Sequence, residues 1–171
     1  MSVLAEAFSV VVPASVLARS YPGGIARYER ESPDRSFCSD GVLTRIAFLA
    51  RKDAEYFVGL LQSEGLTSYE RGVFVDVALL DQNIGSLAPC LWLAFARERG
   101  GTPVCWHVAA RRGALHVPPG WERAASLAHT RFIGRPFTEQ VRYLRAEAQL
   151  DWYHDRSSGR ILTTPQAFTL H

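Results

Sequence analysis

The sequence lacks the short motifs that mark common catalytic and nucleotide-binding sites. It has no G-x-S-x-G nucleophile turn, no G-x-G-x-x-G dinucleotide fingerprint, no Walker loop and no H-E-x-x-H zinc motif. These absences exclude the sequence signatures of α/β-hydrolases, dinucleotide-binding dehydrogenases, P-loop nucleotidases and zincin proteases. What the chain does must therefore be inferred from its pattern of elements and from single residues.

Cysteine and lysine are also scarce. The three cysteines, Cys38, Cys90 and Cys105, show no paired spacing, which disfavours a disulfide framework and favours a reducing compartment. Lys52 is the single lysine among 19 basic residues, and such an arginine bias is more typical of genome composition than of phosphate recognition. No basic leader and no apolar run of membrane-spanning length is seen. We expect a cytoplasmic protein that needs no cofactor and does not enter a membrane.

Charge and aromatic residues are distributed unevenly. Residues 1–96 carry 8 basic and 11 acidic side chains, a net charge of −3, whereas residues 97–171 carry 11 and 6, a net charge of +5. The basic residues do not form the clustered stripe that is typical of nucleic-acid binding, so we regard nucleic acid as an unlikely partner. All four tryptophans lie in the second half: Trp92, Trp106, Trp121 and Trp152. Tryptophan with arginine is typical of protein interfaces, so this half predicts a surface for an acidic protein partner.

The clearest structural signal is a strand–helix–strand block. Residues 42–49 (VLTRIAFL) and 73–82 (VFVDVALLDQ) have the apolar, β-branched character of core strands, and residues 52–65 (KDAEYFVGLLQSEG) have the spacing of an amphipathic helix. Asp53 is predicted to cap this helix, and Gly65 to take the left-handed conformation after its last turn.

The remaining pattern predicts a single α+β domain over residues 1–171, with a mixed, largely antiparallel sheet covered by one or two main helices. Residues 25–40 are predicted to be a surface connection. A second main helix is predicted from Thr138 to Leu150, with Thr138 as its N-cap. The further expected elements are strands at 8–12, 91–96, 104–109 and 114–117, short helices at 14–20 and 121–130, and a closing hairpin over 150–164.

One possible metal site depends on the turn at Arg111 and Arg112. If these residues close a two-residue hairpin loop, His107 faces His116 across the ladder and Cys105 lies on the same side. One cysteine and two histidines on one face resemble a three-ligand zinc site with an open position. The competing interpretation, which we favour, is two polar histidines on the wetter face of a sheet, with no metal.

A possible catalytic site depends on carboxylates or a thiol. Asp76 lies in the middle of a predicted strand, where a buried carboxylate needs a partner, and Asp81 lies near the strand end, where ligand sites gather in open sheets. The alternative is an Asp76–Arg45 ion pair and an Asp81 that caps the next turn. Cys90 could serve as a nucleophile or could be a small buried apolar residue. We favour the structural role in each case and assign no catalytic residue.

Three strings in the chain resemble a family of small bacterial domains that has no assigned activity. They are YPGGI at 21–25, C-x-D-G-x-L at 38–43, and VDVALLDQ at 75–82 with PCLWLAFAR at 89–97. The resemblance covers roughly residues 8–100 and brings no catalytic residue with it. Small α+β proteins of this kind are similar in size and class to immunity proteins, which neutralise bacterial toxins.

We therefore expect a non-enzymatic protein-binding module, an immunity-type protein that binds a cognate toxin. The alternative is a small hydrolase or transferase that uses an Asp or a Cys/His site. The residues expected to contact the partner are Trp121, Arg111, Arg112, His107 and His116.

Overall fold

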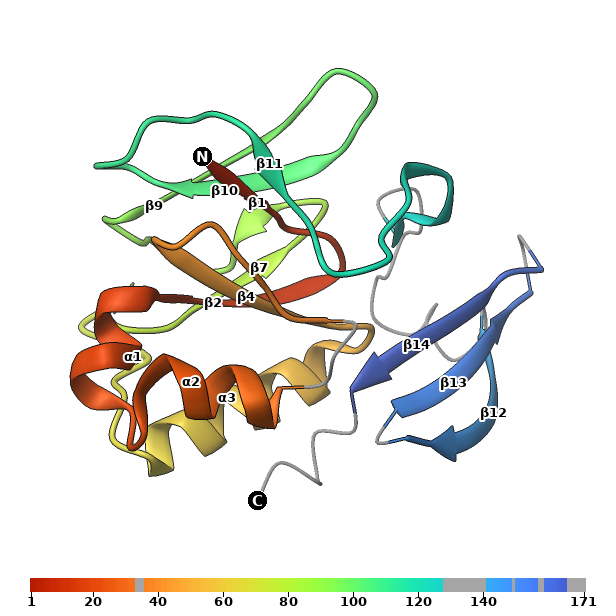
Figure 1. Cartoon of the computed structure of the whole chain (residues 1–171), viewed down its shortest axis with the longest axis horizontal. Helices are drawn as coiled ribbons and strands as arrows, with labels where there is room; N and C mark the ends of the chain where they lie inside the picture. The colour runs from red at the N-terminus through yellow and green to blue at the C-terminus, as the bar shows by residue number, and fades with distance from the viewer. Residues whose placement is uncertain (33–35, 128–140, 149, 157–158, 166–171) are drawn as a thin grey trace.

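The computed structural model describes residues 1–32, 36–127, 141–148, 150–156 and 159–165. Within these residues, three α-helices and several largely antiparallel sheets form the α+β fold that the sequence predicts. Figure 1 shows the helices on one side of a central sheet and a second sheet on the other. The fold is therefore built in three layers, with a further small sheet beside them.

The central sheet has five strands. In sheet order they are β3 (Cys38–Ser39), β4 (Leu43–Phe48), β2 (Phe8–Pro13), β7 (Ala78–Asp81) and β8 (Gly85–Ser86). The middle strand, β2, pairs antiparallel with β4 on one side and with β7 on the other. Every residue of β2 is buried, because both faces of this strand are covered. This explains its continuous apolar, β-branched sequence.

The strand–helix–strand block is confirmed as a unit. Helix α3 (Arg51–Ser63) follows β4 and precedes β7, and β2 lies between these two strands. Since β4 and β7 both run antiparallel to β2, they run parallel to each other. Gly65 has the predicted positive φ, +105°, after the last turn of α3. Asp53 was wrongly predicted as the cap: the N-cap residue is Ala50, and the Asp53 side chain makes no capping bond.

The predicted strand at 73–82 is interrupted. Its first part is β6 (Val73–Phe74), which pairs with β5 (Tyr69–Glu70) in a separate hairpin. The N–H groups of Val75 and Asp76 then donate to Ser68 O and Thr67 O, both at 2.8 Å, so these residues are not available to a neighbour in the central sheet. The apolar pattern does not reveal this local pairing.

Three helices cover the outer face of the central sheet. These are α1 (Ala14–Ser20), which confirms the predicted short helix, α2 (Gly24–Glu31) and α3. The prediction of a surface connection over 25–40 is wrong for α2. Tyr28 explains the difference, because its side chain is 2% exposed and anchors the polar helix in the core. The core beneath the helices includes Val10, Val12, Leu17, Ile46, Phe48, Phe57 and Leu61.

The second sheet contains a strand that the sequence pattern does not indicate. In sheet order its strands are β11 (Leu115–His116), β1 (Ser2–Leu4), β10 (Pro103–His107) and β9 (Leu93–Arg97). The β9–β10 pairing is antiparallel, as predicted for consecutive strands. The predicted hairpin over 104–117 is wrong, because β1 lies between β10 and β11 and pairs with both. Apolar residues from the two sheets meet in a second core, including Val3, Val11, Leu43, Leu80, Leu93 and Cys105.

The C-terminal part forms a three-stranded antiparallel sheet. Its strands are β12 (Val141–Glu147), β13 (Leu150–Asp155) and β14 (Ile161–Pro165). The predicted closing hairpin is confirmed by β13 and β14. The predicted helix over 138–150 is wrong for its described part. Thr138 lies outside the described residues.

Tertiary pairing explains why residues 141–147 are not helical. Tyr143 of β12 lies opposite Tyr153 of β13, with ring centroids 5.6 Å apart, and such cross-strand aromatic pairs stabilise a ladder. Ala148, which lies within the predicted helix, is exposed and has a φ of +54°. Of the short helix predicted at 121–130, the described part contains a single 3-10 turn over Arg123–Ala125. None of the described helices is long and apolar enough to cross a membrane.

Candidate functional site

Asp76 lies in the loop after β6 rather than on a strand. Its Oδ2 atom accepts a hydrogen bond from Thr67 N at 2.9 Å, and its Oδ1 atom is 4.0 Å from Arg19 Nη2. The predicted pair with Arg45 is wrong. The buried Arg45 guanidinium instead donates to the carbonyl oxygens of Leu4, at 2.6 Å, and Ser36, at 3.0 Å. Arg45 thus connects the two sheets, and Asp76 supports its own loop.

Asp81 caps the turn after β7, as the structural alternative predicted. Its Oδ1 atom accepts a hydrogen bond from Asn83 N at 2.8 Å, and the residue is buried at the strand end. In the described part of the chain, neither Asp76 nor Asp81 hydrogen-bonds to a histidine or a cysteine. Within the described residues, no hydrogen bond or ion pair links either carboxylate to a second group that could share acid–base work.

The three thiols lie in surroundings that suppress their reactivity. Cys38 and Cys105 are buried, and Cys90 is half-buried before β9. Loss of hydration raises the pKa of all three thiols, most strongly that of Cys105. A thiol with a raised pKa holds little thiolate at neutral pH, and the thiolate is the nucleophile. This environment suits the interpretation of Cys90 as a small packed residue.

The residues of the possible zinc site are kept apart by β1. Val3 of β1 is the cross-strand partner of both Cys105 and His116, so a whole strand separates these two side chains. His107 lies opposite Leu93, at the end of β10. Cys105 is fully buried and not on a wet face. Among the described residues, no group of three His, Cys, Asp or Glu side chains could hold a metal ion.

The two arginines of the predicted turn lie in the loop between β10 and β11. The Arg112 guanidinium lies 4.6 Å from the centre of the Trp106 ring, and its Nη2 atom is 3.6 Å from Glu98 Oε1. Arg111 is exposed beside it, and its carbonyl oxygen accepts a hydrogen bond from the N-terminal ammonium group of Met1. This loop therefore presents positive charge over an aromatic ring.

Trp121, another expected contact residue, is engaged within the fold. Its Nε1 atom donates to Glu6 Oε2 at 3.3 Å. The same oxygen accepts hydrogen bonds from Ser126 Oγ at 2.9 Å and Leu127 N at 3.0 Å. Glu6, buried in the connection between β1 and β2, thus holds the 121–127 segment in place. This role is structural.

A group of exposed apolar residues gathers where β9 begins and β10 ends. We call it the Trp92 patch and define it as Val75, Leu91, Trp92, His107 and Val108. The exposed fractions of Leu91, Val108 and Val75 are 83%, 53% and 37%. Trp92 and His107 are half-buried between them. Leu91 and Val108 gain nothing from burial within this chain, so their apolar surface is available to a partner.

Hydrogen bonds hold the centre of the Trp92 patch in one arrangement. Trp92 Nε1 donates to Val75 O at 2.6 Å, and Trp92 O accepts from Val108 N at 2.9 Å. The His107 ring stacks on the indole, with centroids 6.2 Å apart and an interplanar angle of 18°. His107 Nδ1 accepts from Ala109 N at 3.1 Å. These contacts join the loop after β6 to both strands and fix the indole before any partner binds.

Sequence reasoning identified this surface in part. His107 was an expected contact residue and Trp92 one of the tryptophans noted, whereas Leu91, Val75 and Val108 looked like strand residues. The sequence did contain a signal that Leu91 lies outside the strand. Pro89 lies two residues before it, and proline disfavours a strand that begins this early. A comparison with protein-family models, curated proteins and solved structures finds no match to the chain.

Proposed function

We propose that this protein is a non-enzymatic protein-binding module and that it binds its partner through the Trp92 patch. The observation that carries the proposal is the exposure of Leu91 and Val108, at 83% and 53%, beside an indole that hydrogen bonds and ring stacking hold in place. Protein interfaces obtain most of their binding energy from a few such residues, with tryptophan prominent among them. A fixed anchor also loses little side-chain entropy on binding.

The charge around the Trp92 patch indicates the chemistry of the partner. The loop after β10, which begins with the patch residue Val108, carries Arg111 and Arg112. Arg111 is exposed, and Arg112 Nη2 is 3.6 Å from Glu98 Oε1. A positive surface accelerates encounter with an acidic partner and disfavours a basic one. We therefore propose a partner that presents an apolar side chain within an acidic surface.

The partner we propose is a bacterial toxin, which this protein neutralises in the cytoplasm by covering the toxin's active site. Two features support this assignment. The first is the expectation from the sequence that residues 8–100 resemble small bacterial domains of a size and class like immunity proteins, and the second is the net charge of +5 on residues 97–171, which suits an acidic target. The alternative of a hydrolase or transferase has less support, because burial raises the pKa of the Cys90 thiol and backbone amides engage Asp76 and Asp81.

The test combines a charge-introducing substitution with a matched control. Leu91→Glu places a carboxylate in the middle of the Trp92 patch, and Ile84→Glu makes the same kind of change at a residue that is 71% exposed. Ile84 follows Asn83, whose side chain accepts a hydrogen bond from Arg97 at the far end of β9 from the patch. Both variants should fold, since both side chains face solvent.

Binding is measured by calorimetry against the purified product of the adjacent gene, and protection by growth of cells that express that product. We expect the wild-type protein and Ile84→Glu to bind and protect equally. Leu91→Glu should bind about 30-fold or more weakly, because it loses an interface anchor and buries a charge. Equal binding by Leu91→Glu would refute the Trp92 patch as the docking surface. If the partner binds but is not toxic, the proposal of a protein-binding module stands and the proposal of an immunity role is refuted.

A further inference from the structure

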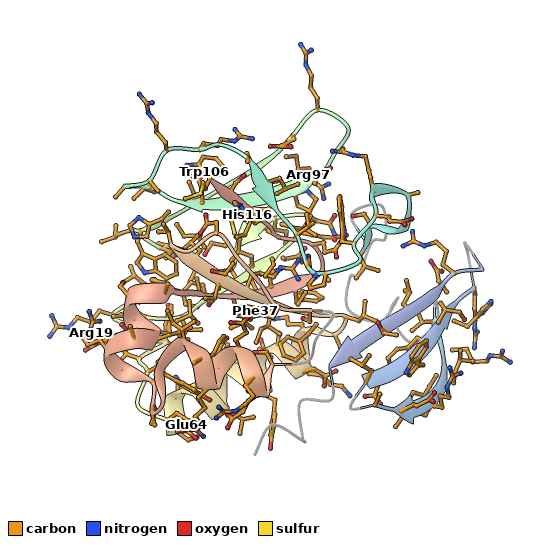
Figure 2. The ribbon with its side chains drawn as sticks, in the orientation of Figure 1. Arg19, Phe37, Glu64, Arg97, Trp106 and His116 are labelled. Carbon is orange, nitrogen blue, oxygen red and sulfur yellow. The ribbon has the colours of Figure 1, made fainter. Side chains whose placement is uncertain are left out.

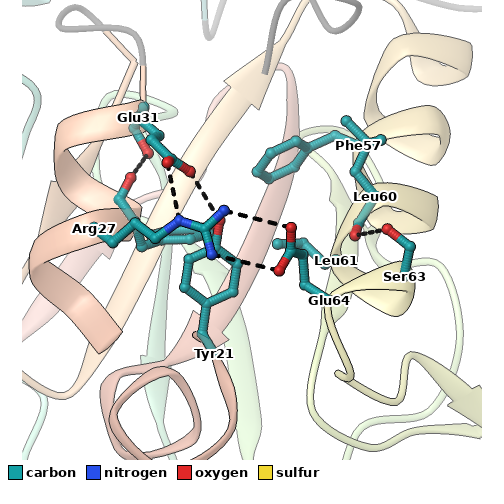
Figure 3. A pocket seen from close by; sticks show the side chains of 10 residues that line it. Tyr21, Arg27, Glu31, Phe57, Leu60, Leu61, Ser63 and Glu64 are labelled. Atoms are coloured by element: carbon teal, nitrogen blue, oxygen red, sulfur yellow. Dashed lines mark hydrogen bonds and ion pairs between the residues drawn. The ribbon is translucent and has the colours of Figure 1, made fainter. Parts of the chain in front are cut away.

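Helix α3 has a pocket on each of two sides. On the side that faces α2, Figure 3 shows Arg27 between Glu31 and Glu64, with N–O distances of 2.9 and 3.5 Å, so ion pairs span the space between these helices. A second pocket lies between α3 and the β5–β6 hairpin. We call it the hairpin pocket. It is the larger of the two, with a volume of about 300 Å³ against about 130 Å³.

Apolar side chains form most of the hairpin pocket. Val58 of α3, Phe74 of β6 and Leu87 line it, and all three are half-buried and pack against the main core. Leu79 of β7, which is 6% exposed, also belongs to the lining. Because the first three side chains still expose apolar surface, a ligand in the pocket can cover what the fold leaves open.

One wall of the hairpin pocket is aromatic. The rings of Tyr69 and Phe74 meet edge to face, with centroids 6.1 Å apart and an interplanar angle of 73°. Tyr69 is 59% exposed, so its ring is accessible from solvent. Aromatic rings favour a further ring in an edge-to-face or offset position. A cavity of about 150 Å³ holds benzene, so the volume of this pocket suits two fused rings.

A polar group in the lining is available to a ligand. Ser68 is 4% exposed and lines the pocket, and its hydroxyl makes no hydrogen bond among the described residues. Unlike the enclosed Tyr28 Oη atom, Ser68 Oγ keeps accessible surface. Buried hydroxyl groups are nearly always hydrogen-bonded, and a serine hydroxyl can both donate and accept. A single O–H or N–H group on a ligand would supply its partner.

The charged residues of the lining compensate each other. Arg51 Nε lies 2.9 Å or less from its partner on the next turn of α3: the distance to Glu55 Oε1 is 2.7 Å. A charged ligand would lose hydration in a mostly apolar pocket and would have to compete with this pair for a counterion. The pocket therefore suits an uncharged ligand.

We propose that the hairpin pocket binds an uncharged molecule of two fused aromatic rings that carries one hydroxyl or N–H group. The rings pack against Tyr69 and Phe74 and cover Val58 and Leu87. The hydroxyl or N–H group forms a hydrogen bond with Ser68 Oγ.

This proposal is independent of the Trp92 patch. Phe74 precedes the patch residue Val75 in the chain, but the pocket and the patch share no residue. The basic loop lies farther away. Figure 2 shows Glu64, the residue after α3, and Trp106, on which Arg112 stacks, at opposite ends of the view.

The probes for the test are 2-naphthol, naphthalene and 2-naphthoate, measured by calorimetry with the full chain titrated into each probe. Naphthalene lacks the hydroxyl group, and 2-naphthoate carries a carboxylate in its place. We expect 2-naphthol to bind about three- to tenfold more tightly than naphthalene, the usual contribution of one hydrogen bond. The carboxylate should bind more weakly than both, because its charge loses hydration.

Three variants locate the site. Ser68→Ala should make 2-naphthol and naphthalene bind equally. Val58→Trp fills the pocket and should abolish binding of both, whereas Gln62→Trp, at an exposed position of α3 outside the lining, should bind like the wild-type protein. Circular dichroism and the melting temperature check that each variant is folded.

Three results would overturn the proposal. The first is that 2-naphthol shows no saturable binding up to its solubility limit. The second is that Ser68→Ala keeps the preference for 2-naphthol, or that folded Val58→Trp binds it like the wild-type protein. The third is that Leu91→Glu, which changes the Trp92 patch alone, loses 2-naphthol binding, since the probe would then sit on the patch.

Discussion

The buried hydroxyl of Tyr28 leads to a prediction with an unusual sign. Replacing a core tyrosine by phenylalanine commonly weakens a protein, because a hydrogen bond is lost. Here the Tyr28 Oη atom is buried without a hydrogen-bond partner among the described residues. In the unfolded chain the same hydroxyl is hydrated. Tyr28→Phe should therefore stabilise the folded protein.

The magnitude follows from the surroundings of the ring. A buried hydroxyl that lacks a hydrogen bond costs about 1–3 kcal/mol relative to water. The ring contacts with Tyr21, Phe37 and Phe57, at centroid distances of 5.4, 6.2 and 6.2 Å, survive the loss of one oxygen atom. The small gap left by that oxygen offsets part of the gain. We expect the free energy of unfolding to rise by about 1 kcal/mol, equivalent to roughly 2–4 °C in Tm for a chain of this length.

Tyr21→Phe is the matched control. Tyr21 belongs to the same aromatic cluster and is also buried, but its hydroxyl donates to Glu31 Oε2 at 3.2 Å. This substitution loses a hydrogen bond to a charged acceptor and should lower the free energy of unfolding by about 1 kcal/mol. The same chemical change at two neighbouring tyrosines is thus expected to have opposite effects.

Urea unfolding followed by circular dichroism measures both variants against the wild-type protein. The midpoint concentration should rise for Tyr28→Phe and fall for Tyr21→Phe, with unchanged slopes, because the surface exposed on unfolding is nearly the same. A lower midpoint for Tyr28→Phe would refute the reasoning, since it would mean that the hydroxyl has a stabilising partner in solution.

Two further predictions concern ionisation. Hydrogen bonding from Arg27 lowers the pKa of Glu31, so the stabilising effect of this carboxylate is present above the unfolded pKa, about 4.3, and is lost as the pH falls through the lower folded value. Glu31→Gln should therefore be less stable than the wild-type protein at neutral pH, and urea midpoints should converge below about pH 4; a constant difference down to pH 2 would contradict this. Ellman's reagent should label Cys90 slowly in the native protein, and the rate should increase with pH. Cys38 and Cys105 are buried, so the reagent should label them only when urea unfolds the protein. Rapid labelling of more than one thiol under native conditions would show that the burial is wrong.

Local patterns predicted the elements whose own residues decide their conformation. The alternation and β-branching of 8–12 and 42–49 and the apolar spacing of 52–65 correspond to β2, β4 and α3, and Gly65 has the expected positive φ. Asp81 caps its turn through a neighbour two residues away, a contact that depends on the local sequence alone. Such features could be read from a short window, since the interacting groups lie within that window.

The failures share a dependence on distant partners. Residues 141–147 have a helical spacing but form β12, because β13 offers Tyr153 and a ladder of hydrogen bonds. Helix α2 is mostly polar and is held by one buried residue, Tyr28, whose aromatic neighbours come from other elements. The predicted pairing of His107 with His116 is wrong because Ser2–Leu4, a hundred residues earlier in the chain, lies between their strands. Intrinsic propensity is a weak prior where such contacts compete.

By itself, the sequence determined the α+β class, the strand–helix–strand block and a second half rich in arginine and tryptophan, because composition and periodicity are properties of the chain alone. The tertiary structure decided where these side chains lie. It brought Trp92 against Val75, His107 and Val108, joined Arg45 to Leu4 and Ser36, and buried Tyr28 among Tyr21, Phe37 and Phe57. Each of these results needs residues far apart in the sequence to meet. Strand order and register control such meetings, and a single inserted strand changes every cross-strand neighbour.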